Sequence, residues 1–294
     1  MIAAVSFAFS LTSSVNVFAA TSPVLVGAAG YSVLGGAAVS CTGSTTAAGA
    51  VGVSPGTSIS GFSSPCTAGG GTHSNDASAI AAQADSNTAF GTLDQNCDHT
   101  YGAQDLTLLS PLGPGVYCST SSFSLSGNLT LTGSGVWIFK TVSTLITSPG
   151  SSVTGGDPCN VWWRIGSSAT LDTTTAFIGT IIAQNGITAL NTGATLDGRV
   201  LALSAGTVTL DANTITGPTC ATTNSSFNSG FSGSSNTTNG TSSGSSSSTK
   251  TTPGAPNTGY GVYSTDPWRN LTAYGLGAIG LSTLAFVTRR IAKN

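Results

Sequence analysis

Leucines and short apolar segments recur at nearly constant spacing through the middle of the chain. The leucines stand 19, 20, 26, 19 and 20 residues apart, and they are Leu106, Leu125, Leu145, Leu171, Leu190 and Leu210. Between them come a stretch rich in threonine and apolar residues, which ends at a glycine, and then a third apolar run, as at residues 136–139, 161–163, 180–183 and 199–202. Three short β segments per period of about twenty residues predict one coil of a β-solenoid.

The repeats occupy residues 100–220, and the preceding sequence adds further β segments. The 26-residue gap holds the turn-rich insertion Gly155–Asn160, which we expect to bulge from one corner without disturbing the stack. Residues 24–66 contain four more β-like pieces, at 31–34, 38–41, 50–53 and 58–60. The chain is therefore expected to be mostly β.

A single helix is predicted near residues 74–92. Ser74 or Asn75 is a suitable N-cap, and Gly91 ends or loosens the helical pattern. Small residues recur at helical spacing, and we expect them to form the buried stripe: Ala77, Ile80, Ala81, Ala84 and Thr88. The pattern favours a helix that lies along the solenoid and covers one of its faces.

The low charge of the chain limits the partners that it can have. Its 294 residues include 8 basic and 10 acidic side chains, for a formal net charge of −2. Charged residues make up 6% of the sequence, against about 25% in an ordinary soluble domain. Because no basic cluster precedes the extreme C-terminus, we expect no nucleic-acid partner.

The first nineteen residues resemble a secretory signal peptide. Residues 2–11 are apolar, and Val17-Phe18-Ala19 places small residues where signal peptidase cleaves, so we expect the mature chain to begin at Ala20. The basic start of an ordinary signal is missing. A buried N-terminal strand is the alternative interpretation of this segment.

The six cysteines indicate an oxidising compartment and a disulfide framework. Several pairings are possible, and we expect the nearest-neighbour scheme: Cys41–Cys66, Cys97–Cys118 and Cys159–Cys220. The last bond would join the insertion to the final coil. Metal binding is disfavoured because no CxxC pair is present and Cys97-Asp98-His99 crowds three ligands in a row. We therefore expect no metal site and no cofactor.

The C-terminal region predicts a surface anchor. Residues 221–255 contain Ser, Thr, Gly and Asn with almost nothing apolar, so we expect a flexible stalk. Then come Pro256-Asn257-Thr258-Gly259, an uncharged apolar run over residues 271–287, and Arg289, Arg290 and Lys293. This order resembles a sortase-type cell-wall sorting signal, with Ala255 where leucine is usual. A C-terminal hydrophobic helix that stays in the membrane is the alternative, and both place the solenoid outside the cell.

No arrangement of residues in the sequence predicts catalysis. His73 and His99 are the two histidines, and neither has a nucleophile in a recognisable local frame. Three aspartates follow the repeat as turn residues do: Asp172, Asp197 and Asp211. The basic residues within the repeats are few and dispersed: Lys140, Arg164 and Arg199. We expect no enzyme, and a polysaccharide-active enzyme is the last of three functional interpretations.

The outward side of the coils carries a column of small residues with hydroxyl or methyl groups. If the recurring leucine points inward, the residue before it points outward, because side chains alternate along a strand. That column is Ser124, Thr144, Thr170, Ala189 and Thr209, whereas Thr154 falls on another face. Coils stack about 4.8 Å apart and outward residues along a strand repeat about 6.7 Å apart, so such a face is a regular grid. The plainer explanation is that threonine is a good β former.

Several motifs resemble the microbial ice-binding proteins that have a discontinuous β-solenoid. They are Val51–Thr57 with Gly61-Phe62, the helix opening His73–Ala77, Leu112–Cys118, Pro158–Trp163 and Asn191–Arg199, in the same order over residues 24–220. The resemblance implies a triangular solenoid with a long helix beside it, coils that are not laid down in sequence order, and a cap region at one end. It also maps the family's Thr-Ala/Gly-x-Thr/Asn motif onto Thr42–Thr45 and Thr192–Thr195.

We therefore expect a monomeric, extracellular, surface-anchored protein whose partner is ice. Its parts are a signal peptide (1–19), a solenoid domain (20–220), a stalk (221–255) and an anchor (256–294). The expected ice-binding residues are Thr42, Thr45, Thr57, Ser124, Thr144, Thr170, Thr192, Thr195 and Thr209. The alternative is a cell-surface adhesin for carbohydrate or protein, for which exposed aromatic side chains are needed, the candidates being Trp137, Trp162 and Trp163.

Truncation tests the predicted domain boundary. Deleting residues 221–294 is expected to release the protein into the medium with its thermal unfolding and ice activity unchanged, because such a stalk buries no core. An earlier melting transition, followed by circular dichroism, would show that the stalk packs against the solenoid. Replacing Thr258 separates the two anchoring modes, since only a sortase needs that residue.

Overall fold

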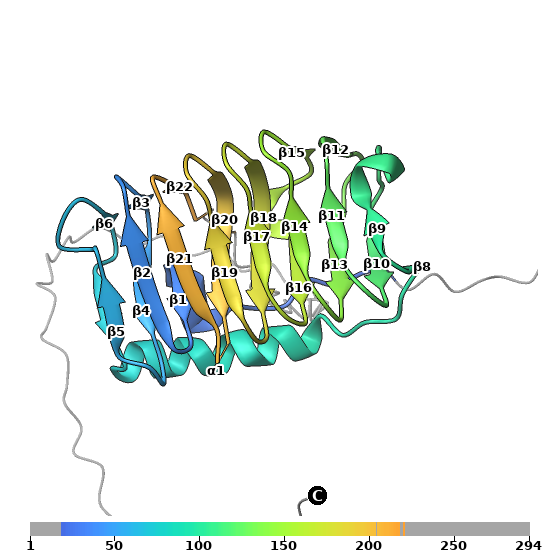
Figure 1. Ribbon diagram of the computed structural model, residues 1–294. Helices are drawn as coiled ribbons and strands as arrows, with labels where there is room; N and C mark the ends of the chain where they lie inside the picture. The colour runs from blue at the N-terminus through green and yellow to red at the C-terminus, as the bar shows by residue number, and fades with distance from the viewer. Residues whose placement is uncertain (1–18, 204, 218–219, 221–294) are drawn as a thin grey trace, which may run out of the picture. The chain divides into compact units, whose positions relative to one another are not determined.

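Parallel strands wound into coils form the described part of the protein, which in this computed structural model comprises residues 19–203, 205–217 and 220. One strand from each coil joins an eight-stranded sheet, called the front face because it lies nearest the viewer in Figure 1. Its strands, in spatial order, are β5 (Ser58–Ser60), β2 (Ala38–Thr42), β21 (Thr207–Asp211), β19 (Ile187–Leu190), β17 (Ala169–Leu171), β14 (Leu145–Thr147), β11 (Phe123–Leu125) and β9 (Gln104–Asp105).

A 14-stranded sheet forms the other two sides of the coils. The third face consists of β6 (Thr67–Ala68), β3 (Thr46–Ala47), β22 (Thr214–Ile215), the first halves of β20 (Thr195–Ala202) and β18 (Ala176–Ala183), β15 (Ser152–Gly155) and β12 (Asn128–Leu131). The helix face consists of β7 (Thr72–Ser74), β4 (Ala50–Val53), β1 (Tyr31–Gly35), the second halves of β20 and β18, β16 (Val161–Ile165), β13 (Trp137–Thr141), β10 (Gly115–Ser119) and β8 (His99–Tyr101). The three-sided, mostly β solenoid is confirmed.

The coils are not stacked in sequence order. β1 pairs with β20 through Val33 and Val200, and β2 pairs with β21 through Cys41 and Leu210, so the last coil lies directly against the first. In Figure 1 the blue strands β1 to β3 therefore stand beside the orange strands β21 and β22. The helix α1 carries the chain from one end of the stack to the other, where β8 begins the ascending coils. The discontinuous solenoid implied by the resemblance is confirmed.

The helix α1 spans Ala77–Thr92, and the residues predicted to be its buried stripe are wrong. Ala77, Ile80, Ala81, Ala84 and Thr88 are all exposed, with Ile80 at 52%. The buried side consists instead of Ala79, Ala82, Ser86, Ala89 and Phe90. The N-cap is also shifted, because Asp76 rather than Ser74 or Asn75 accepts the backbone N–H of Ala79 (2.9 Å). Both sides of the helix carry mostly small residues that would let it approach a sheet. The side that includes Phe90 is the one that packs against the solenoid.

The glutamine Gln83 ties the helix to the junction between the first and last coils. Its Nε2 donates to the carbonyl of Gly35 in β1 (3.0 Å) and to that of Ala202 in β20 (2.9 Å). Nearby, Arg199 donates from Nε to the carbonyl of Ala29 (3.1 Å), which belongs to the 3-10 helix η1 (Val26–Gly30). Segments far apart in the sequence are thus joined by side chain to backbone bonds as well as by strand pairing.

The register of the coils differs from the predicted leucine alignment at one point. Leu145 pairs with Phe123 and Ala169, not with the leucines of those coils. The equivalent positions are therefore Phe123, Leu145, Ala169, Thr188 and Val208, which stand 22, 24, 19 and 20 residues apart. The coils that begin at Phe123 and Leu145 are therefore both longer than the later ones. The coil that begins at Leu145 contains the insertion with the 3-10 helix η3 (Pro158–Asn160). As predicted, β13, β16 and β18 still pair without interruption.

Large apolar side chains fill the inside of the coils. All six recurring leucines are buried, including Leu106 at the start of the 3-10 helix η2 (Leu106–Leu109). Aromatic rings stack from coil to coil, with centroid distances of 5.1 Å for His99–Tyr117, 5.4 Å for Tyr117–Phe139 and 4.2 Å for Phe139–Trp163. The interior is a packed core that holds each coil against the next.

All three predicted disulfides are confirmed. The bonds are Cys41–Cys66, Cys97–Cys118 and Cys159–Cys220, with sequence separations of 25, 21 and 61 residues. The third joins η3 in the insertion to a residue that follows the last coil. The longest covalent loop therefore closes at the point where the solenoid chain ends.

Several predictions concern residues outside the described part of the chain. They are residues 1–18 of the signal peptide, the stalk, the sorting motif and the hydrophobic segment near 271–287. Among the residues that the structure describes, no helix has both the length and the apolar character needed to span a membrane. The signal peptide and the anchor remain predictions.

Loss of the Cys159–Cys220 bond is expected to lower the unfolding free energy by about 2–5 kcal/mol, the usual range for a native disulfide in a small secreted domain. The double variant Cys159→Ser/Cys220→Ser removes the bond without leaving a free thiol, and chemical denaturation measures the change. An unchanged midpoint would mean that strand pairing alone holds the last coil in place.

The buried hydroxyl of Thr188 offers a second stability test. Thr188 is 0% exposed, points into the core from β19, and its Oγ1 has no hydrogen-bond partner among the described residues. Because an unpaired buried hydroxyl costs about 1–3 kcal/mol, Thr188→Val is expected to raise the unfolding free energy by about 1 kcal/mol.

The matched control for that substitution is Thr147→Val. Thr147 is equally buried, but its hydroxyl bonds that of Thr175 (2.8 Å) and accepts the N–H of Asp172 (2.8 Å). This variant is therefore expected to lose about 1–3 kcal/mol of stability. If both variants shift the melting temperature in the same direction, the two hydroxyls do not differ as described.

Candidate functional site

The front face presents small hydroxyl and methyl groups in register. Its central outward column, read through the strand pairs, is Ser60, Ser40, Thr209, Ala189, Thr170, Ile146 and Ser124. Inward neighbours such as Val208 and Leu171 are buried, so the alternation fixes which side chains face out. The column repeats at the coil spacing of about 4.8 Å. Of the predicted positions, Ser124, Thr170, Ala189 and Thr209 do form one column.

The predicted column contains one residue from a neighbouring column. Because Leu145 pairs with Ala169 rather than with a leucine, Ile146 and not Thr144 faces outward between Ser124 and Thr170. Extending the same register by one residue places Thr144 level with Ser168, in a second outward column that also contains Thr207, Ala38 and Ser58. Thr144 therefore stays on the front face, two residues before Ile146.

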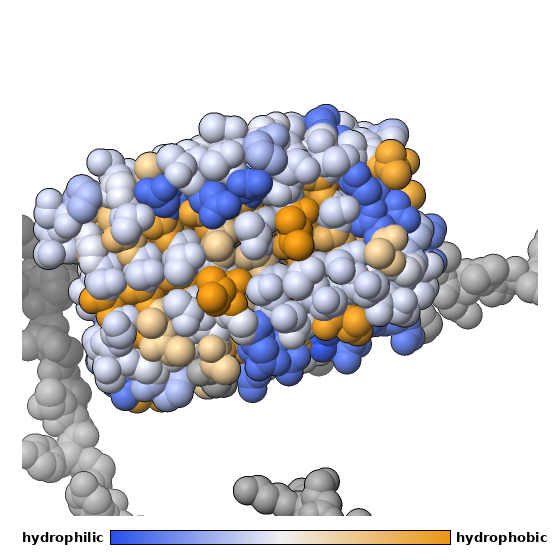
Figure 2. Space-filling model, viewed as in Figure 1, coloured by the Kyte–Doolittle hydropathy of each residue, from blue (hydrophilic) through white to orange (hydrophobic). Residues whose placement is uncertain are grey.

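The front face carries almost no charge away from its edges. Neither outward column contains a charged residue between β5 and β11, and acids occur only at Asp105 in β9 and at the corner toward the third face. Ile146 and Ile187 are 51% and 55% exposed and stand above the smaller neighbours. Figure 2 shows this face as mostly pale, with several hydrophobic patches across its middle and hydrophilic residues near its upper edge.

The corner carboxylates join adjacent coils. Asp172 accepts the side-chain amide of Asn191 (3.0 Å) and the backbone N–H of Thr173 (2.7 Å), and these bonds hold the pKa of its carboxyl below the usual value. Asp211 accepts the hydroxyl of Thr42 in the next coil (3.2 Å). Asp172 follows β17 at the corner, as predicted, whereas Asp211 is the last residue of β21 and not a turn residue. Their oxygens serve the protein's own hydrogen bonds.

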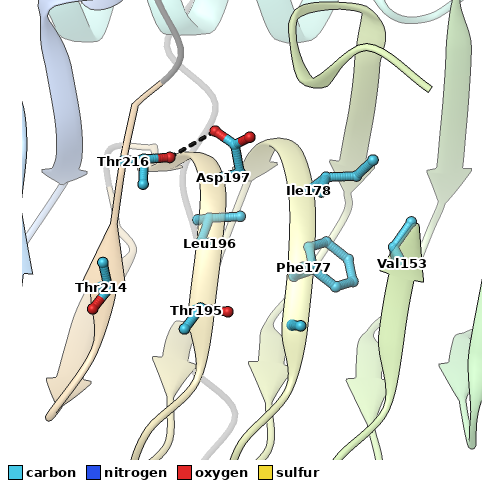
Figure 3. Close-up of a pocket in the computed structure, with 9 residues that line it drawn as sticks. Val153, Phe177, Ile178, Thr195, Leu196, Asp197, Thr214 and Thr216 are labelled. Carbon is cyan, nitrogen blue, oxygen red and sulfur yellow. Dashed lines mark hydrogen bonds between the residues drawn. The ribbon is translucent and has the colours of Figure 1, made fainter. Parts of the chain in front are cut away.

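Asp197 is a correction to that prediction. It lies within β20, not in a turn, and its Oδ1 accepts the hydroxyl of Thr216 (2.6 Å) on the third face. A shallow hollow of about 410 Å³ opens beside it, lined by Val153, Ala176, Phe177, Ile178, Thr195, Leu196, Asp197, Thr214 and Thr216. In Figure 3, Thr214 and Thr195 lie side by side on neighbouring strands, and Phe177 lies toward Val153.

The first tetrad does not place both of its threonines on the surface. Thr42 is exposed at the end of β2, but Thr45 is 1% exposed and its hydroxyl accepts the backbone N–H of Asn213 (3.0 Å). Thr45 is therefore a structural corner residue and does not belong to an adsorbing surface. The exposed threonine of this corner is its neighbour Thr46.

The second tetrad is out of phase with the first. Thr192 is exposed at the corner and donates its hydroxyl to Asp211. Thr195 is exposed on the third face, where it pairs with Thr214, which in turn pairs with Thr46. Thr195 is thus equivalent to Thr46 and not to Thr45. Thr57 was predicted to bind ice but was not assigned to a face, and it is exposed just before β5.

The aromatic residues needed by the adhesin alternative are buried. Trp137 and Trp163 point into the core and are 0% exposed. Trp162 is 4% exposed on the outside of β16, where its Nε1 donates to Ser22 Oγ (3.1 Å) in the N-terminal segment. None of the three can contact a sugar ring.

The charged residues outside the front face also have structural partners. His73 Nδ1 lies 2.8 Å from Asp76 Oδ2, just before the start of α1. Lys140 donates to Asp94 (2.9 Å), a bond that holds the pKa of this carboxyl below its usual value. Within the described ranges, no group of three or more His, Cys, Asp or Glu side chains could hold a metal ion.

The fold agrees with what comparison with known proteins finds. The sequence model of the Ice-binding-like family matches residues 33–216. The chain belongs to this family. An ice-binding protein from Nostoc sp. (strain HG1) is 41% identical over 188 residues, which cover 60% of this chain and 67% of that protein. The ice-binding protein of Flavobacterium frigoris is 36% identical over 124 residues, or 42% of its length.

Solved structures give the same assignment. An ice-binding protein from an Antarctic biological consortium superposes with a TM-score of 0.61 at 36% identity, covering 71% of this chain and 95% of that one. The ice-binding protein of the ascomycete Antarctomyces psychrotrophicus gives 0.60 at 33% identity, covering 68% of this chain and 100% of that one. The family match at residues 33–216 lies within the solenoid.

Proposed function

We propose that this protein adsorbs to ice through the front face and so inhibits ice growth or recrystallisation. The observation that carries the proposal is the column Ser40, Thr209, Ala189 and Thr170, which stands in register and contains no charged residue. Its relatives with matching sequences are ice-binding proteins. Water held between neighbouring methyl and hydroxyl groups can then merge with the crystal lattice.

Rigidity is what allows many weak contacts to add up. Threonine is β-branched, so its first side-chain torsion is already restricted in a strand. Alanine and serine have little or no rotamer freedom to lose, and the backbone beneath them is fixed by pairing on both sides. Binding therefore carries a small ordering cost, which would otherwise offset contacts of this strength.

The absence of charge from the central column of the front face serves the same purpose. An ammonium or carboxylate group holds its hydration shell strongly, in an arrangement unlike that of ice. The ice surface between adsorbed molecules becomes curved, and further growth there is disfavoured. This mechanism makes and breaks no covalent bond. We infer that the protein acts without catalysis and as a monomer.

The setting of this activity is extracellular. Three disulfides persist in oxidising compartments and are rare in the cytosol. The signal peptide and the anchor over residues 256–294 complete the proposal, with attachment to the membrane or the cell wall. Slow freezing of a solution of the full chain tests the function itself, because an ice-binding protein concentrates in the ice while a bystander stays in the liquid.

Substitution at the centre of the front face tests the surface. Thr170→Tyr and Thr209→Tyr are each expected to remove most of the inhibition of crystal growth, because a large side chain holds its neighbours away from the lattice. The melting temperature should stay near that of the parent, since both residues face outward.

The control is Ala84→Tyr on the exposed side of α1, which lies over the helix face. It adds the same side chain away from the front face and is expected to leave crystal growth inhibition intact. Full activity in both front-face variants would show that another surface binds ice.

A further inference from the structure

Four threonines form an uninterrupted ladder on the third face. Thr67 in β6 pairs with Thr46 in β3, Thr46 pairs with Thr214 in β22, and Thr214 pairs with Thr195 in β20. All four are exposed. With a coil spacing of about 4.8 Å, the ladder spans roughly 14 Å. It is the longest run of one residue type in any outward column that the strand pairs define.

The hydroxyl groups of the ladder are available to water. Among the described residues, none of the four donates or accepts a side-chain hydrogen bond within the protein. Other threonines at this end of the solenoid differ, since Thr216 bonds Asp197 and Thr42 bonds Asp211. The ladder thus presents hydroxyl groups that can bond water, with methyl groups beside them, as the front face does.

The ladder stands on paired strands above a packed interior. The residues that follow the threonines point inward, and Ala47, Ile215 and Leu196 are 1% exposed or less. The ladder crosses the junction where the first and last coils pair, and the Cys41–Cys66 bond closes the two coils at its outer end. Its side chains therefore stand on a backbone that is fixed by both pairing and packing.

The surroundings limit what can occupy this surface. The ladder itself contains no charged residue. Two of its threonines, Thr195 and Thr214, stand at the edge of the shallow hollow, where the nearest carboxylate, Asp197, accepts the hydroxyl of Thr216. Among the residues that line the hollow, the one aromatic side chain is Phe177, which is 2% exposed. A sugar polymer would lack a stacking partner, whereas an ordered water lattice needs only the repeat.

We propose that the ladder is a second ice-binding surface that meets the front face along the corner containing Thr42 and Thr192. This inference rests on the proposed function. The two surfaces lie on different sides of the triangular coil, so they cannot lie flat on one crystal plane together. The protein would therefore adsorb to two sets of ice planes.

Labelling of a single ice crystal distinguishes the two surfaces. The full chain, carrying a fluorescent dye, is frozen slowly into a hemisphere grown from one crystal, and the labelled planes are mapped. The parent protein is expected to label two sets of planes. Thr46→Tyr and Thr214→Tyr should each lose one set and keep the other, while Thr170→Tyr should lose the complementary set. Ala84→Tyr should keep both, and circular dichroism confirms that each variant is folded.

The outcomes separate this inference from the proposed function. If the parent does not enter ice at all, the proposed function fails. If the parent labels ice, Thr170→Tyr abolishes all labelling, and both ladder variants keep the parent pattern, the second surface is refuted while the proposed function stands. If the ladder variants lose all labelling and Thr170→Tyr loses none, the ladder is the binding surface and the front-face assignment is refuted.

Discussion

Parallel backbone pairing between coils is the interaction on which the rest of this structure depends. Each strand satisfies its N–H and C=O groups with the coils above and below, so side chains at the same level are fixed about 4.8 Å apart. The same pairing directs alternate residues into a core of leucine, valine and stacked aromatic rings. A surface with a regular repeat follows from the backbone, and the choice of outward residue then decides its chemistry.

Closing the stack requires the first and last coils to find each other across most of the chain. The contact is made by β1 with β20, β2 with β21 and β3 with β22. Gln83 stabilises it from the helix, because its amide reaches carbonyl groups on both sides of the junction. The helix thus covers the apolar outside of one face and also holds together the two segments that end there.

The three sides of the coil therefore differ in what covers them. The helix face carries large outward residues such as Ile138 and Leu201, which pack beneath α1 and the N-terminal segment. The front face and the third face have no such cover among the described residues, and their outward positions hold mainly Thr, Ser and Ala. Apolar outward residues therefore mark the covered side, and small hydroxyl residues mark the two sides that meet water.

The sequence by itself determined what depends on neighbours in the chain: the coil repeat, the short β segments before residue 66 and the approximate limits of the helix. Only the tertiary structure decided which side of the helix is buried, because Ala79 and Ala82 are no larger than Ala81 and Ala84. It also decided the register at Leu145, since the extra residues are divided between two coils. The complete threonine ladder could not be predicted. Thr195 and Thr214 are one coil apart in the sequence, as are Thr46 and Thr67, but the two pairs meet only when the last coil pairs with the first, and no local pattern encodes that pairing.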